Sequence, residues 1–392
     1  MTSELPLSGI RIADFSWVLA GPHCTKWLGA MGAEVIKVES HFRPDRFRGV
    51  APFIGDTESI DSSIAWNMLN YSKKDCTINL GTAKGQELAQ DLVERSDVVI
   101  ENFSAGVAER LGLDYSVLSK RNPKLVMVSS SGVGRTGPDA GMRAFGKSIH
   151  AFAGQTYLTR WPHTPPRGVG GTWTDPITGV TSALAILAAL EFVATGGDGV
   201  HLDLSMAEAT MALLAEPFLE FLNDSHEAEP TGNYDPSLLI HDSFQTLDGG
   251  WVAIAAHSER EESGLRQLLQ DHQCPATREE LEASLRRFCG TINRDTILAE
   301  LERLGVCAVP VFSFDELESS PQYVSRSLAQ RLVNDGVGAY TAMKLPWTQS
   351  PSTPFVYTPA PKLGEDNRYV LESILDLSED IVEDLLQSDA MM

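Results

Sequence analysis

Eight basic residues lie close to the ends of predicted strands, where their side chains could hold the phosphate groups of a ligand. Guanidinium and ammonium groups are common donors to phosphate, and the backbone N–H groups of a turn can add to them. Each residue could equally be an ordinary surface charge, so the set only defines candidates for an anion site. These residues are Lys37, Arg46, Arg48, Lys73, Lys74, Arg110, Arg135 and Arg143.

A glycine-rich stretch, residues 132–137 (GVGRTG), follows a predicted strand with the spacing of a dinucleotide-binding turn. Pro138 comes directly after it, so no helix can begin inside the motif and receive a pyrophosphate at its N-terminus. We therefore interpret the stretch as a flexible turn and not as an NAD site.

Nucleophile and metal motifs are scarce in this sequence. Ser129–Ser131 stand at the end of a predicted strand, but there is no GxSxG motif and no evident partner histidine, which favours a solvated turn. The nine histidines and five cysteines show no metal-ligand spacing, so no metal site is predicted. The scattered cysteines are expected to be reduced thiols.

The elements that must position these residues alternate between strand and helix in the first half of the chain. Strand-like segments of valine, isoleucine and leucine alternate with helix-like ones. This pattern predicts a doubly wound parallel sheet with helices on both faces. The first predicted strand and its exit loop cover residues 9–19, and further strands are predicted near 33–39, 97–103 and 124–131. The predicted helices lie at 20–32 and 81–96.

The second half has a different pattern. Two helical segments (residues 176–195 and 205–223) and an acidic linker precede a hairpin with its turn at residues 248–250, charged helices and a further strand at 306–312. We predict a large Rossmann-like domain from residues 1–225 and 331–392, with 176–225 as a helical connection. Residues 226–330 are predicted to form a small α+β domain.

Composition excludes several classes of protein. The 392 residues are 43% hydrophobic and 21% charged, which is typical of a globular chain and not of a disordered one. The net charge of −22 would repel nucleic acid and anionic membranes, so neither is expected as a partner. The longest apolar run, residues 183–190, is too short to span a bilayer, and the first fifteen residues show no secretory signal. We expect a cytoplasmic protein.

Several segments, taken together, resemble the family III CoA-transferases, which include formyl-CoA and carnitine CoA-transferases and the α-methylacyl-CoA racemases. The resemblance covers about nine-tenths of the chain in a shared order. Its main segments are LSGIRIADFSWVLAGP, GAEVIKVE, LNYSKKDCTINL, SDVVIENFSAGVAERLGLDY, NPKLVMVSSSGVGRTGP, TWTDPITG and LGVCAVPVFSFDELESSPQ.

This resemblance implies a large Rossmann-like domain, a smaller domain and two subunits that interlock like links of a chain. It also implies CoA and acyl-CoA as substrates, with no permanently bound cofactor. The residues implied to bind CoA are Val18, Ala20, Lys37, Arg46, Leu69, Lys73, Lys74, Asn102, Phe103, Arg110 and Arg135. In transferases of the family, an aspartate carboxylate attacks the acyl-CoA thioester and forms covalent intermediates.

The sequence departs from the family pattern at this aspartate. In the matching stretch, residues 145–154, glycine stands at the nucleophile's position as Gly146 and histidine stands at the glutamine position as His150. Asp175, in TWTDPITG, is the second carboxylate of the racemase branch, but it could equally cap the helix that follows. Lys147 is a further candidate catalytic residue.

Three functions therefore remain open. The first is a CoA-transferase subunit that moves CoA between a donor such as succinyl-CoA and a carboxylic acid, with the nucleophilic aspartate supplied by a related partner subunit. The second is a homodimer that performs racemisation, isomerisation or lysis with Asp175, His150 or Lys147. The third is a CoA-binding subunit without catalysis. Trp17, Trp161, Trp173 and Phe145 could form an apolar acyl pocket in the first, which would suit a bulky or aromatic acid.

Overall fold

The computed structural model describes residues 5–55, 58–269, 277–350 and 355–392. The described chain divides into two compact units: the larger one lies within residues 5–156, 168–226 and 328–392, and the smaller one within residues 157–167 and 227–327, apart from the gaps just given. The predicted division placed residues 157–167 in the large domain, whereas they lie in the smaller unit. There the backbone N–H of Gly232 donates to the Arg160 carbonyl oxygen at 3.2 Å, which ties the two segments together.

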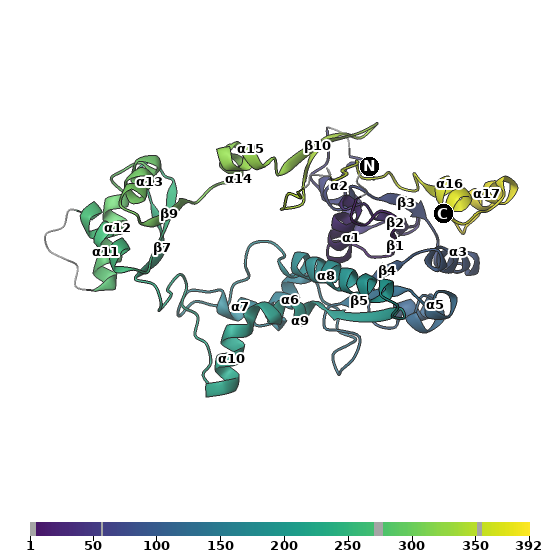
Figure 1. Cartoon of the computed structure of the whole chain (residues 1–392), viewed down its shortest axis with the longest axis horizontal. Coiled ribbons are helices and arrows are strands. Elements are labelled where there is room, and N and C mark those ends of the chain that lie inside the picture. Colours follow the sequence, from purple (N-terminus) through teal and green to yellow (C-terminus); the bar gives the residue numbers. More distant parts are fainter. Residues whose placement is uncertain (1–4, 56–57, 270–276, 351–354) are drawn as a thin grey trace. The chain divides into compact units, whose positions relative to one another are not determined.

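A six-stranded parallel sheet is the centre of the larger unit (Figure 1). Its order is β3-β2-β1-β4-β5-β6, and each neighbouring pair is parallel. The sequence prediction missed β3, which has only four residues, and β6, in which polar and apolar residues alternate. The strands are β1 (Arg11–Asp14), β2 (Glu34–Glu39), β3 (Lys74–Thr77), β4 (Val98–Glu101), β5 (Val126–Ser131) and β6 (Val200–Ser205).

Apolar side chains cover both faces of this sheet. One face packs against α3 (Ala83–Glu94), α5 (Tyr115–Arg121) and the C-terminal helix α17 (Glu379–Leu386) through a core that includes Leu88, Leu118 and Leu385. The other face packs against α1 (Ala20–Ala30) and α8 (Thr174–Ala194) through Leu28 and Ile186. The predicted doubly wound sheet is therefore confirmed.

The helix α8 crosses α1 at a glycine. A Cβ atom on Gly179 would lie 2.8 Å from the Ala20 carbonyl oxygen and 3.0 Å from His23 Cδ2, so only glycine permits this close approach. Among the described helices, α8 alone is long and apolar enough to cross a membrane. About a third of it is buried, and Ala183 and Ile186 on that face belong to the core beneath the sheet.

The remaining elements of the larger unit are short helices and a hairpin. The antiparallel pair β10 (Ala329–Asn334) and β11 (Gly338–Met343) contributes Leu332 and Tyr340 to a small core with Tyr71. The helices are α2 (Ile64–Asn70), α4 (Val107–Arg110), α6 (Gly146–Phe152), α9 (Met206–Met211), α10 (Ala215–Asp224) and α16 (Asn367–Tyr369); α7 (Gln155–Leu158) lies where the chain passes between the units.

The smaller unit has its own α+β core. The antiparallel strands β7 (Ile240–Gln245), β8 (Trp251–Ala256) and β9 (Cys307–Pro310) pack against α11 (Glu259–Leu269), α12 (Arg278–Cys289) and α13 (Arg294–Arg303). Phe244, Leu285 and Leu301 are fully buried between them. The predicted hairpin is present, with Gly249 at φ +81° in its turn. Two further helices, α14 (Phe314–Ser319) and α15 (Pro321–Arg326), follow β9.

The cysteines are free thiols where the structure describes them. Cys24, Cys76 and Cys289 are buried and Cys307 is exposed, while Cys274 lies outside the described residues.

Candidate functional site

The turn between β1 and α1 holds a strained valine at the carboxyl end of the sheet. Val18 has φ +68°, a conformation that β-branched residues rarely adopt. Asn102, which follows β4, fixes Trp17, the residue before Val18. Its Oδ1 accepts from the Trp17 N–H and its Nδ2 donates to the Trp17 carbonyl oxygen, both at 2.7 Å. Asp45 Oδ2 accepts from the Val18 N–H at 2.9 Å. Strain that the surroundings maintain is typical of functional sites, so this turn is a candidate ligand site.

Three other residues implied to bind CoA are largely enclosed by protein. Ala20, the first residue of α1, is 3% exposed, and Leu69 in α2 is 6% exposed. Phe103 is half-buried against the sheet core, and its N–H donates to Glu101 Oε2 at 2.7 Å. Their backbone atoms and apolar surfaces shape the carboxyl end of the sheet but add no charge to it.

Two of the candidate lysines are fully buried below the turn. Lys37 donates to the Ser16 carbonyl oxygen, and its Nζ lies 3.6 Å from Asp45 Oδ2. Lys73 Nζ lies 3.2 Å from Asp14 Oδ2 and also donates to Asn70 Oδ1 at 2.9 Å. Burial lowers the pKa of Lys73 to about 8, although Asp14 opposes the shift. Both ammonium groups therefore stabilise the turn from inside and are not directed at solvent.

Exposed arginines follow β2 and β4, two strands that flank β1 in the parallel sheet. Arg46 and Arg110 are exposed, and no ion pair is recorded for either within the described ranges. Arg43, which the sequence analysis missed, lies with its guanidinium carbon 5.2 Å from the Trp17 ring centroid. Its signal in the sequence was the spacing of three arginines in the segment HFRPDRFR. These cations are free to meet an anionic ligand.

The other basic candidates are held by carboxylates or lie further along the chain. Arg135 contacts Glu101 and Glu109, each at 2.8 Å, and Lys74 Nζ lies 3.3 Å from Asp366. Arg48 is 1% exposed and forms ion pairs with three acids beneath the Trp66 ring. Arg143 is exposed near the start of α6. Sequence position alone could not separate these paired residues from the free arginines.

A second group of residues joins α6 to the start of α8. His150 Nε2 accepts hydrogen bonds from the N–H groups of Trp173 and Thr174, both at 3.0 Å. The ring is therefore neutral and carries its proton on Nδ1, and burial lowers the pKa of His150 accordingly. Thr174 Oγ1 donates to the Gly146 carbonyl oxygen at 2.8 Å.

Asp175 lies in the first turn of α8 and is directed at Gly146. A Cβ atom built on Gly146 would stand 1.9 Å from Asp175 Oδ2 and 3.2 Å from Asp175 Cγ. Burial raises the pKa of Asp175 to about 6, and no cation pairs with its carboxylate among the residues that the structure describes. Lys147, the next residue of α6, is exposed. The structure thus brings Gly146, His150 and Asp175 together.

Aromatic side chains adjoin this group. Phe145, directly before Gly146, is 66% exposed, and Trp173, two residues before Asp175, is 55% exposed. Trp17 belongs to the β1–α1 turn, while Trp161 lies in the smaller unit. Of the four predicted acyl-pocket residues, Phe145 and Trp173 adjoin the candidate carboxylate in sequence.

The serine stretch 129–131 is not the solvated turn that we predicted. Ser129 and Ser130 are buried within β5, and Ser129 Oγ lies 2.9 Å from His201 Nε2 on β6. The sequence analysis missed this histidine because it also missed β6. Ser129 is fully buried, so it does not present a nucleophile to a ligand.

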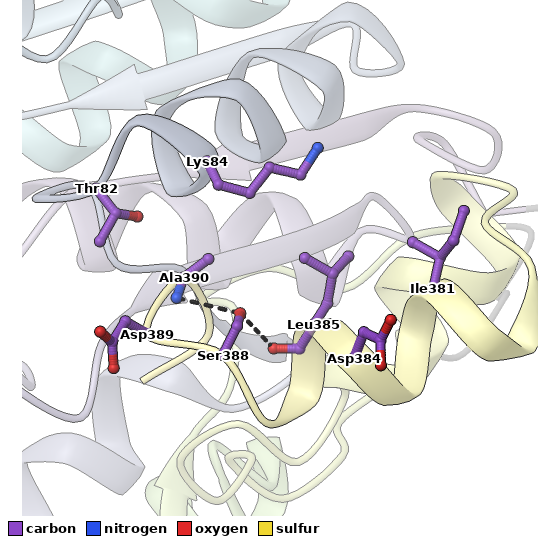
Figure 2. A pocket seen from close by; sticks show the side chains of 8 residues that line it. All are labelled: Thr82, Lys84, Ile381, Asp384, Leu385, Ser388, Asp389 and Ala390. Carbon is purple, nitrogen blue, oxygen red and sulfur yellow. Dashed lines mark hydrogen bonds between the residues drawn. The ribbon is translucent and has the colours of Figure 1, made fainter.

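A cavity of about 410 Å³ lies elsewhere in the larger unit (Figure 2). Its polar atoms are partly satisfied within the chain, since Ser388 donates to the Leu385 carbonyl oxygen at 2.7 Å and accepts from the Ala390 N–H at 3.3 Å. None of the candidate site residues lines it. The lining residues are Thr82, Lys84, Ile381, Asp384, Leu385, Ser388, Asp389 and Ala390.

The chain is similar to known proteins over almost its whole length. Residues 7–367 match CoA-transferase family III. The chain is 30% identical to succinyl-CoA–D-citramalate CoA-transferase of Chloroflexus aurantiacus, covering 96% of this chain and 95% of the relative. It is also 30% identical to the alpha subunit of succinyl-CoA–L-malate CoA-transferase of Chloroflexus aurantiacus, covering 97% of this chain and 92% of the relative.

A solved structure gives the same result at the level of the fold. The crystal structure of a CAIB/BAIF family protein from Brucella suis superimposes with a TM-score of 0.86 at 29% identity, covering 95% of this chain and all of that one. The family resemblance in the sequence is therefore confirmed, and the chain belongs to CoA-transferase family III.

Proposed function

We propose that this CoA-transferase moves CoA from succinyl-CoA to a carboxylic acid. The observation that carries the proposal is the strained β1–α1 turn, which Asn102 and Asp45 hold in place beside free arginines. The names of the two Chloroflexus relatives support succinyl-CoA as the donor. CoA is here a substrate that binds and leaves, and no permanently bound cofactor is required.

The CoA nucleotide is proposed to lie over the β1–α1 turn. Val18 and Ala20 would offer backbone to it, and Arg46 and Arg110 would meet its phosphates. Lys37 and Lys73 would contribute indirectly, by holding the turn in place, since their ammonium groups already pair with protein carboxylates. The local positive charge of the exposed arginines would allow a chain of net charge −22 to bind a polyanion.

An interlocked dimer is part of the proposal. No residue of α10 is buried, and its apolar side chains Phe218, Leu219 and Leu222 are all more than half exposed. A soluble chain rarely leaves such a face uncovered, and a second subunit would cover it. In one form of the proposal, a related subunit supplies the nucleophilic aspartate that Gly146 lacks; the relative named as an alpha subunit supports this form.

The test is to purify the chain alone and together with a related family member, and to assay each with succinyl-CoA and a panel of carboxylic acids. Mass spectrometry of the CoA esters detects the new acyl-CoA, and native mass spectrometry gives the subunits present. Transfer by either preparation supports the proposal. Absence of transfer from both, with CoA esters still bound, would leave a binding subunit without catalysis.

A matched pair of variants checks where CoA binds. Arg110→Ala should raise KM for succinyl-CoA by about 10-fold, because a lost phosphate contact costs about 1–2 kcal/mol. Arg303→Ala, an exposed arginine of the smaller unit paired with Glu300, is the control and should leave KM unchanged. An equal effect of both changes would contradict the placement of CoA.

A further inference from the structure

A buried ion cluster lies beside the β1–α1 turn, and the Arg48 guanidinium is at its centre. Arg48 is 1% exposed, and its guanidinium carbon lies 3.6 Å from the Trp66 ring centroid. The guanidinium donates to both Glu39 oxygens and lies 2.6 Å from Asp61 Oδ1 and 3.3 Å from Asp75 Oδ2. All three of its nitrogens bind carboxylates, so Arg48 does not offer a contact to a phosphate.

Three carboxylates can surround this one cation because one of them is neutral. Burial and the adjacent Glu39 raise the pKa of Asp75 well above its usual range, so Asp75 keeps its proton and donates it to Glu39. Arg48 lowers the pKa of Glu39, although burial opposes the shift. The backbone N–H groups of residues 363–364 donate to Asp61 at 3.0 Å and to Asp75 at 2.6 Å. Each carboxyl group therefore has hydrogen-bonding partners, which gives a buried polar network a single arrangement.

Asp45 joins this cluster to the turn. Glu39 Oε1 accepts from the Asp45 N–H at 2.6 Å, so the cluster fixes the Asp45 backbone. Asp45 Oδ2 accepts from the Val18 N–H and Asp45 Oδ1 accepts from the Phe47 N–H, both at 2.9 Å. An unbroken line of contacts therefore runs from the Arg48 guanidinium to the Val18 backbone.

The turn requires such a restraint because Val18 is β-branched. At φ +68° its side chain crowds the backbone, and an unrestrained valine would return to negative φ. A strained conformation persists only where its surroundings hold it in place. The line of contacts from Arg48 supplies that restraint on the Val18 N–H.

The same cluster anchors one of the exposed arginines. Arg46 and Arg48 belong to one short 3-10 helix, Arg46–Gly49, whose N-cap is Asp45. Arg48 is buried in the cluster and Asp45 caps the start of the helix, so the helix has one orientation. In that orientation Arg46 is exposed and can meet an anionic ligand.

We propose that Arg48 is a positioning residue for CoA binding: through Glu39 and Asp45 it keeps the β1–α1 turn in its binding conformation before CoA arrives. This inference rests on the proposed function and deepens it, because it separates the residue that prepares the turn from the arginines that contact phosphate. Such preorganisation strengthens binding, since less conformational freedom is lost when the ligand binds.

The affinity for free CoA, measured by isothermal titration calorimetry, tests the proposal. Arg48→Lys keeps the charge but cannot form the forked contact with Glu39, so it should raise the Kd for CoA by about 10-fold. Arg121→Lys is the matched control, because Arg121 pairs with Asp91 and Glu94 between α3 and α5. The control should lose stability but keep its Kd. An unchanged Kd in a folded Arg48→Lys chain would contradict the proposal.

A change at position 18 separates positioning from a general loss of structure. Glycine adopts φ +68° without side-chain strain, so Val18→Gly should make the turn less dependent on its restraints. In the Val18→Gly background, Arg48→Lys should raise the Kd by less than about 3-fold, against about 10-fold in the native sequence. An equal rise in both backgrounds would show that Arg48 acts on the fold as a whole and would overturn the inference.

Asp45→Asn repeats the test without changing Arg48, in case the Arg48→Lys chain does not fold. Asparagine has a single acceptor oxygen, so it cannot accept from the N–H groups of both Val18 and Phe47. Its Kd for CoA should rise, and the rise should again be smaller with Val18→Gly. Circular dichroism establishes that each variant is folded.

The outcomes distinguish this inference from the proposed function. A native chain that transfers CoA, with a Kd that neither Arg48→Lys nor Asp45→Asn changes, would overturn the inference alone. A native chain that binds no CoA would overturn both.

Discussion

At the residue scale, burial favours the neutral forms of two neighbouring side chains, His150 and Asp175, with opposite effects on stability. His150 becomes a neutral acceptor that caps α8, and burial lowers its pKa. Asp175, directly after the Thr174 that His150 caps, has no cation among the described residues, and burial raises its pKa to about 6. The first residue stabilises the helix and the second destabilises the fold, which is the arrangement expected where stability is exchanged for reactivity.

This contrast gives a prediction for stability. Asp175→Asn should raise the free energy of unfolding by about 1–3 kcal/mol near pH 8, because the amide removes a buried charge. The native pKa of about 6 lies above the ordinary value of 3.8, so the destabilisation is complete above pH 6 and declines as the pH falls toward 4. Urea unfolding of both proteins at several pH values measures the difference. A variant that is less stable at pH 8 would indicate a structural role for Asp175.

Single residues also mark the limit of the sequence analysis. The strand-end lysines were recognised, but the partners of Lys37 and Lys73 are Asp45 and Asp14, which lie 8 and 59 positions away along the chain. Such pairs depend on how strands align and leave no local signal. The same holds for Asp175. The sequence named it as a candidate carboxylate, but only the structure shows that it lies beside Gly146.

At the scale of elements, the site depends on how α8 lies against α1 and α6. Gly179 permits the close crossing with α1, and His150 of α6 fixes the start of α8. The sequence predicted this helix at residues 176–195, which begins two residues after its observed start and ends one residue beyond its observed end. The helix predicted at 205–223 is instead divided into α9, a short 3-10 turn and α10.

A larger side chain at the crossing should separate these helices. Gly179→Val should lower the free energy of unfolding by about 1–3 kcal/mol, since its Cβ would overlap the Ala20 carbonyl oxygen. Thermal unfolding followed by circular dichroism measures the loss. The control is Gly141→Ala, because no atom lies within 4 Å of the added Cβ there and the backbone is outside the left-handed region. Equal stability of Gly179→Val and the native chain would contradict the close crossing.

The exposed face of α10 gives a prediction for assembly. Leu222→Glu should weaken subunit association by about 10-fold or more, because it places a charge on a face that a second subunit would bury. The side chain is 60% exposed, so the fold of the chain itself should not change. Sedimentation velocity over a range of concentrations measures association. An unchanged dimer would show that α10 lies outside the interface.

At the scale of the whole molecule, each unit has a separate core. The fold class and the smaller α+β unit followed from the change in sequence pattern. The residues 157–167 could not be assigned in that way, because they join the smaller unit through backbone contacts with a segment about 70 residues later.

Separate cores should respond separately to core truncation. Leu285→Ala removes a fully buried side chain of the smaller unit and should cost about 2–5 kcal/mol there. Hydrogen exchange should therefore accelerate in α11, α12 and α13 while β1, β4 and β5 keep their protection. Accelerated exchange throughout both units would mean that they unfold as one.

The last residues of the chain, including α17, complete the cover on one face of the larger sheet. This late cover has a consequence for synthesis on the ribosome. Val370, Leu371 and Leu385 complete a core whose other side includes Phe15 and Met127. At about 5–20 residues per second, the strands through β5 emerge roughly 10–50 s before this cover is made. Throughout that interval the part of this apolar face that α17 covers stays open, although α3 and α5 are already present. Slow translation of the second half should therefore favour aggregation, and early binding by a chaperone should oppose it.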